Sequence, residues 1–214
     1  MRRIAIIPFP FTAPVRPALL AAGLLAAISL PAAARLLGDP AVAFSADDTV
    51  TVDGRSFAGK IHAVPGSQRH DETIGGMPQT IILHADGTGW LVLPALHSYI
   101  AFGFAPALAE LGRPDLLSTP VGKATIGGKP TTEYRVEHAA RDGSRVDGYL
   151  WLTREGIPMR GEATYTPPHG GHPMPIRFEL SHLAEGPQPK ALFALPPNLG
   201  RLDAGALAPL LGWR

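Results

Sequence analysis

The sequence predicts a mainly β protein built on a single curved antiparallel sheet of about ten strands. Apolar and polar residues alternate in many short runs, which is the pattern of strands that bury one face. Turn signals such as Asp53-Gly54, Pro65-Gly66 and Asp86-Gly87 separate these runs at nearly regular spacing. Helical patterns are few and short. The sheet should therefore have a charged, wet face and an apolar face that needs a cover.

The first 34 of the 214 residues predict a cleaved signal peptide. Arg2, Arg3 and Arg16 precede the apolar run 18–30, and Ala32 to Ala34 fit the small-residue rule for cleavage before Arg35. The run is short for a transmembrane helix, and retention as an anchor is the alternative. Residues 35–214 are expected to form one domain.

The net charge and the cysteine content limit which partners and which kinds of site the sequence allows. The whole chain has 19 Lys and Arg against 18 Asp and Glu, and the leader holds three Arg and no acid. The remainder therefore carries 16 against 18, a net charge of −2, with scattered basic residues, so no nucleic acid is expected. The absence of cysteine excludes disulfides, thiolate metal sites and a lipid anchor on cysteine.

Each expected strand is a run bounded by turn residues. In the first half the runs form one continuous meander over 44–102, and they resume in the second half after residue 131. The expected strands are 44–54, 56–66, 68–74, 79–84, 89–94, 98–102, 132–138, 145–153, 159–165 and 176–182.

Short helices should cover part of the apolar, concave face. Residues 106–111 begin with Pro and stop at Gly112, with Leu108 and Leu111 on one face. The apolar tail 191–197 is expected to be extended and to add to the cover, and Asp203 to cap a helical turn from Ala204. So thin a cover leaves either a filled core or an apolar cavity.

Several motifs along the chain resemble exported domains of unknown function related to the Lol lipoprotein carriers. They are Phe44-Ser-Ala-Asp47, Gly59-Lys60, Pro65-Gly66, Arg69, Trp90-Leu-Val-Leu-Pro94, Tyr99, Gly127–Tyr134, Gly148–Trp151, Gly156–Met159 and Leu192–Pro197. The resemblance covers nearly all of 35–214. It implies a half-barrel with helices over its concave face, which in the Lol carriers binds lipid acyl chains in the periplasm. The carriers begin with a sizeable helix, for which residues 35–43 are too few.

Aromatic and aliphatic residues on the predicted strands and on the 106–111 helix are the candidates for lining an apolar cavity. Trp90, Tyr134 and Phe178 are favoured for the concave face, whereas Trp151 shares its face with Asp147 and is expected to be exposed. The full candidate set is Phe44, Phe57, Ile61, Trp90, Val92, Tyr99, Tyr134, Val136, Leu150, Phe178, Leu108 and Leu111.

Candidate chemistry is sparse. His169, His172 and Met174 form the one weak metal candidate, since imidazole and thioether suit copper; the alternative is a loop with solvated histidines. The other histidines are expected at the rim or surface. No catalytic motif occurs, and the neighbours in Asp47-Asp48 and Asp71-Glu72 point to opposite faces of a strand, so neither pair is a dyad.

The sequence therefore favours a non-enzymatic periplasmic carrier or binding protein, without a cofactor, for a lipid, a lipidated protein or another apolar ligand. Transient contacts with envelope proteins go with this interpretation. The alternative is a structural or interaction module of the envelope with a filled core, and metal binding at the His169–Met174 loop is a minor third reading.

Overall fold

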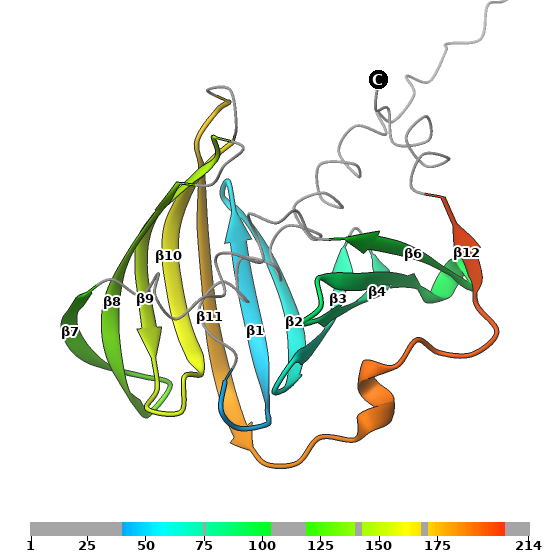
Figure 1. Cartoon of the computed structure of the whole chain (residues 1–214), viewed down its shortest axis with the longest axis horizontal. Coiled ribbons are helices and arrows are strands. Elements are labelled where there is room, and N and C mark those ends of the chain that lie inside the picture. The colour runs from blue at the N-terminus through cyan, green and yellow to red at the C-terminus, as the bar shows by residue number, and fades with distance from the viewer. Residues whose placement is uncertain (1–39, 75, 104–118, 140–142, 168–170, 204–214) are drawn as a thin grey trace, which may run out of the picture.

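Twelve strands form one curved, open sheet in the computed structural model, which describes residues 40–74, 76–103, 119–139, 143–167 and 171–203 (Figure 1). All ten expected strands occur. The sequence does not predict β7 and β12. The strands are β1 (Phe44–Val52), β2 (Arg55–Val64), β3 (Ser67–Ile74), β4 (Met77–His84), β5 (Thr88–Leu93), β6 (Ser98–Gly103), β7 (Thr119–Ile126), β8 (Lys129–Ala139), β9 (Arg145–Leu152), β10 (Pro158–Thr166), β11 (Met174–Glu185) and β12 (Gly200–Leu202).

Two antiparallel meanders are joined edge to edge in this sheet. β1 to β6 follow one another as neighbours, as the sequence predicts, and β7 to β11 form the second meander. β1 pairs with β11 along almost its whole length, and β12 pairs in parallel with β6. Pairing between sequence neighbours thus forms each meander, and the long-range pairing of β1 with β11 joins the two meanders into one sheet.

The two faces of the sheet differ as the alternating pattern predicts, except in β4 and β5, where Ile82 and Val92 are buried on the face that should be wet. The register places Val50, Phe57, Leu91 and Phe178 on one face, called the inner face below. The opposite, outer face carries ion pairs across strands, such as Arg160 with Glu179 and Arg177 with Glu162. Buried apolar residues fall into three clusters: Phe44, Ala46, Ile61, Ala63, Ile126, Ile157, Met159 and Leu180; Val136, Leu150, Leu152 and Phe178; and Ile74, Ile81, Leu83, Leu91 and Ile100.

The hairpin turns form where the sequence signals them. Asp53 and Gly54 both have positive φ angles, 48° and 76°, between β1 and β2. Gly127 and Gly128 do the same between β7 and β8, at a turn that the sequence analysis does not predict, with φ of 56° and 76°. Two consecutive positive φ angles are typical of a type I′ turn, whose twist matches that of the paired strands.

Glycines on the inner face give room to large neighbours. Gly161 of β10 lies opposite Phe178 of β11, whose ring occupies the space that a Cβ of residue 161 would need. Gly89 of β5 is related to Phe102 of β6 in the same way. The aromatic ring therefore packs directly on backbone, which a sheet curved toward this face requires.

One end of the curved sheet is closed by residues from both meanders. Phe44 and Ile61 of the first meander pack with Ile126, Met159 and Leu180 of the second. On the rim of this cluster the Lys129 ammonium lies 2.7 Å from a Glu185 carboxylate oxygen. Curvature thus brings the β7–β8 turn next to the end of β11.

The segment after β11 departs from the sequence prediction. Residues 191–197 are not fully extended, because Lys190–Phe193 form the 3₁₀ helix η4. The η4 segment binds to Arg69, which lies on the outer face, so the expectation that this tail covers the apolar face is wrong.

Cover by helices on the inner face is not seen in the described ranges. The two described helices are η4 and the 3₁₀ helix η1 (Pro94–Leu96), which connects β5 to β6 and buries no residue. The expected helix at 106–111 and the turn from Ala204 lie outside the described residues. Within the described part of the chain, no helix combines the length and hydropathy that a membrane crossing needs.

Replacing Gly161 with Ala should destabilise the protein by about 1–3 kcal/mol, because the new methyl group overlaps the Phe178 ring. Urea unfolding followed by far-UV circular dichroism measures this loss. In the Phe178→Leu background the same Gly161→Ala change should cost less, since the ring is gone. An equal cost in both backgrounds would contradict the packing of ring on glycine.

Candidate functional site

A pocket opens on the inner face where the two meanders join. Its lining comes from β1, β2 and β3 on one side and from β10 and β11 on the other. The enclosed volume is about 20 Å³, room for one or two water molecules and too little for an acyl chain. The lining residues are Phe44, Asp48, Val50, Ile61, Gln68, His70, Glu72, Pro158, Phe178 and Leu180.

Four polar side chains form the floor of this mostly apolar pocket, and we call Asp48, Gln68, His70 and Glu72 the polar floor. Strand parity positions them, because Gln68, His70 and Glu72 alternate along β3 on the face that also carries Ile74. Asp48 comes from β1, two strands away. Exposure is only 9% for Asp48, 5% for His70 and 3% for Gln68.

Gly59 makes the approach of these groups possible. It lies in β2 between Asp48 and Glu72 in the register, and a Cβ there would lie 2.8 Å from Asp48 Oδ1 and 3.3 Å from the Glu72 Cβ. The missing side chain lets β1 and β3 place acidic groups toward each other across β2. His70 Nδ1 lies 3.4 Å from Asp48 Oδ2.

Burial raises the pKa of the Glu72 carboxyl. The Asp48 charge adds to this effect, while a 2.8 Å hydrogen bond from Gln79 Nε2 and the proximity of His70 oppose it. Two further atoms of the polar floor, Gln68 Oε1 and His70 Nε2, are buried without a hydrogen-bond partner in the described structure. Buried polar atoms are normally paired, so these two mark an incomplete network.

Nine of the twelve candidate residues from the sequence divide into three groups. Phe44, Ile61 and Phe178 line the pocket. On the same face but outside the lining, Tyr134, Val136 and Leu150 pack against Phe178, and Phe57 packs in the cluster around Leu91. Leu108 and Leu111 lie outside the described residues.

Trp90, Val92 and Tyr99 lie on the outer face, so the expectation that Trp90 shares a face with Phe178 is wrong. Val92 pairs with Tyr99. Leu91, which lies between Trp90 and Val92 in the sequence, pairs instead with Ile100 on the inner face. Both residue sets of β5 are apolar, and each contains a buried residue, Leu91 on the inner face and Val92 on the outer face. Trp90 is half-buried, with its ring edge-on to His84 at 4.9 Å between centroids. Trp151 is half-buried as well, under the Arg160 guanidinium.

The polar floor is the part that sequence reasoning missed. The parity argument on the two acidic pairs holds, because Asp47 contacts His182 on the outer face while Asp48 faces the pocket. It did not reveal that Asp48 and Glu72 converge. His70 was expected at the rim or surface and is buried instead; its parity with Ile74 is the signal that could have shown this.

The candidate metal site at His169, His172 and Met174 has no further ligand among the described residues. His169 lies outside them, His172 is exposed and Met174 is half-buried at the start of β11. Among the residues that the structure describes, no group of three or more His, Cys, Asp or Glu could hold a metal ion.

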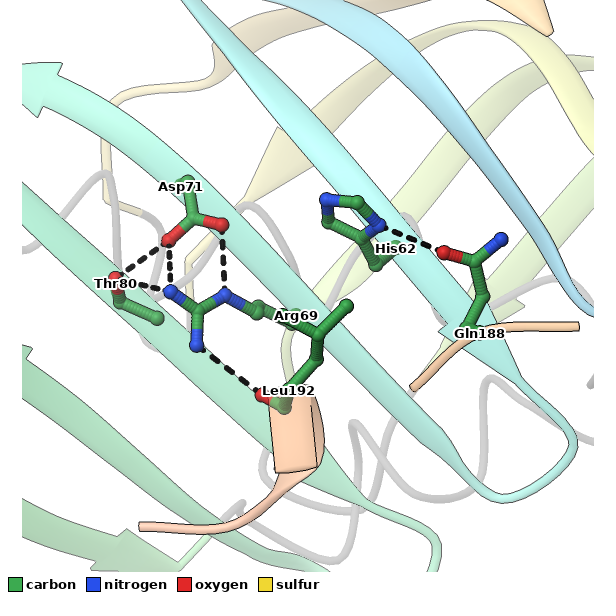
Figure 2. A network of polar contacts seen from close by, with 6 residues as sticks. All are labelled: His62, Arg69, Asp71, Thr80, Gln188 and Leu192. Carbon is green, nitrogen blue, oxygen red and sulfur yellow. Dashed lines mark hydrogen bonds and ion pairs between the residues drawn. The ribbon is translucent and has the colours of Figure 1, made fainter. Parts of the chain in front are cut away.

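On the outer face, an arginine fixes the segment that follows β11 (Figure 2). The Arg69 guanidinium binds both Asp71 carboxylate oxygens at 2.7 Å and donates to the Leu192 carbonyl oxygen at 3.2 Å. Burial opposes ionisation of Asp71, but hydrogen bonds from Arg69 and Thr80 and the Arg69 charge lower its pKa overall. His62 Nδ1 and Gln188 Oε1, 2.8 Å apart, add a second tie to the same segment.

Comparison with known proteins gives structural likeness only. No protein-family model and no curated protein sequence matches the chain. Among solved structures, it is similar to the Pseudomonas aeruginosa MucA/MucB complex with 19% identity and a TM-score of 0.49, over 81% of this chain and 62% of that chain. The match therefore spans less than two thirds of the MucA/MucB chain.

Two smaller proteins are matched over almost their whole length. LprF from Mycobacterium bovis is 15% identical with a TM-score of 0.39, over 79% of this chain and 98% of that chain. A domain described as an outer membrane lipoprotein-sorting protein, from Vibrio parahaemolyticus, is 12% identical with a TM-score of 0.35, over 80% and 96%. At these identities and scores, the likenesses assign neither a ligand nor a partner to this chain.

Replacing Glu72 with Gln should raise the free energy of unfolding at pH 7. The raised pKa of folded Glu72 means that the ionised carboxylate destabilises the folded state, and the loss grows as pH rises from the ordinary value of 4.5 through the folded pKa. The gain should therefore vanish below pH 4.5. Urea unfolding at a series of pH values checks this, and a variant that is no more stable than wild type at pH 7 contradicts it.

Replacing Arg69 with Lys should lower stability by about 1–3 kcal/mol, because an ammonium cannot keep both carboxylate contacts and the Leu192 contact. Limited proteolysis should then cut within 186–199 more rapidly. Arg177→Lys is the matched control, since its pair with Glu162 is exposed and should cost no more than about 1 kcal/mol. Equal losses in the two variants would mean that Arg69 is an ordinary surface arginine.

Proposed function

We propose that this chain is a carrier or binding protein for a lipid, a lipidated protein or another apolar ligand, which it holds on the inner face of the sheet. The observation that carries the proposal is the pocket at the junction of the meanders. Aromatic and aliphatic side chains from β1, β2 and β11 form most of its wall, and they belong to the one-sided apolar face of the sheet.

Binding of a chain-like ligand requires the pocket to widen, because about 20 Å³ admits no acyl chain. Val50 and Tyr134 are half-buried residues of the wall and of its surroundings, so they have more freedom to move than fully buried neighbours such as Leu150. The ligand would then take the place of contacts between these side chains and lie along the inner face.

We propose binding rather than covalent catalysis. Apart from the acidic groups and His70, the described residues of the pocket lining offer no common nucleophile, because Ser, Thr, Cys, Lys and Tyr do not occur among them. The leader of residues 1–34, if cleaved, would deliver the domain to the periplasm, where lipids and lipidated proteins are the apolar ligands at hand. Contacts with envelope proteins would be transient in this role.

The small enclosed volume favours a second candidate, an envelope structural or interaction module whose core is filled. The two candidates differ in one measurable property. A carrier takes up an apolar molecule in saturable fashion, whereas a filled core does not.

Uptake of the neutral fluorescent probe N-phenyl-1-naphthylamine by the delipidated protein tests the proposal. Wild type should bind it saturably, and Val50→Trp should weaken binding by at least about tenfold, because the indole fills the pocket. Thr49→Trp is the matched control, since the adjacent residue is exposed on the outer face. Absence of saturable uptake by wild type, or equal uptake by the two variants, would favour the filled-core module.

A further inference from the structure

The polar floor places four hydrogen-bonding side chains beneath an apolar wall, where an aliphatic lining alone would suffice for an acyl chain. Asp48 and Glu72 approach each other across Gly59, and His70 lies beside Asp48. Burying such groups costs free energy unless each is paired. Pairing is incomplete here, because Gln68 Oε1 and His70 Nε2 have no hydrogen-bond partner among the described residues.

The two unpaired atoms are both suited to accept a hydrogen bond. His70 Nδ1 faces the Asp48 carboxylate, which favours a proton on Nδ1, so Nε2 is an acceptor when the ring carries one proton. Gln68 Oε1 is an acceptor by its chemistry. His70 and Gln68 are more than nine-tenths buried and both line the pocket.

The charge of the floor points the same way. Asp48 and Glu72 are acidic, no Lys or Arg is among the described residues of the lining, and a further negative charge there would be repelled at short range. The enclosed volume of about 20 Å³ suits a small group such as a hydroxyl. The floor therefore offers acceptors and negative charge to a compact donor.

We infer that the polar floor selects apolar ligands whose head is an uncharged or cationic hydrogen-bond donor, such as a hydroxyl or an amine, and rejects a free carboxylate. The head would donate to His70 Nε2 and Gln68 Oε1 while the apolar part lies against Phe44, Ile61 and Phe178. The inference rests on the proposed function, because the floor selects nothing unless the inner face takes up an apolar ligand.

Displacement of N-phenyl-1-naphthylamine by dodecanol, dodecylamine and lauric acid, each at pH 7.5 and below its solubility limit or micelle concentration, tests the inference. The three compounds share one chain length and differ in the head. Dodecanol and dodecylamine should displace the probe at concentrations at least about tenfold lower than lauric acid, a difference of roughly 1.4 kcal/mol.

The variant Asp48→Asn/Glu72→Gln removes the negative charge at constant size and should reduce this selectivity to about twofold or less. Asp47→Asn is the matched control, because Asp47 is the sequence neighbour on the outer face, and its selectivity should equal that of wild type. Thermal unfolding confirms that each variant is folded.

The outcomes separate the inference from the proposed function. Saturable probe uptake with equal displacement by the three compounds overturns the inference and leaves the carrier proposal standing. The same holds if the double variant keeps the selectivity of wild type. No uptake of the probe by wild type overturns the carrier proposal and the inference with it.

Discussion

The pairing of β1 with β11 is the contact on which the rest of the structure depends. It aligns Val50 with Phe178 and Asp48 with Leu180, and so joins the apolar sides of two meanders into one inner face. The pocket depends on this junction, since residues of both meanders form its wall. Without the pairing, each meander would expose an unpaired strand edge and the apolar side chains that it contributes to the junction.

Local chemistry made much of the fold predictable. Asp53-Gly54 adopts the two positive φ angles that its hairpin needs, and alternation in β8 to β11 separates the charged outer face from the apolar inner one. β7 escaped prediction because Pro120 and Gly122 weaken its pattern, which an edge strand with a bulge tolerates. β12 is too short to have a pattern of its own.

The site was less predictable, because it depends on parity and on distant strands. In β5 both residue sets are apolar, so the pattern could not assign Trp90 to a face. Arg69 holds the segment after β11 on the outer face by a hydrogen bond to the Leu192 carbonyl oxygen. The apolar side chains of that segment give no signal for a contact made by its backbone. Asp48 and Glu72 meet only through the register of β1, β2 and β3, with Gly59 between them.

The junction of the two meanders also sets an order in time. β1 is the first of the described strands to be synthesised, yet its second neighbour is β11, and closing so long a loop is slow. Until β11 arrives, β1 is a free edge with an apolar face, which is a template for association with other chains. The C-terminal half therefore protects its own N-terminal half from aggregation, and a chain truncated before residue 174 would lack that protection.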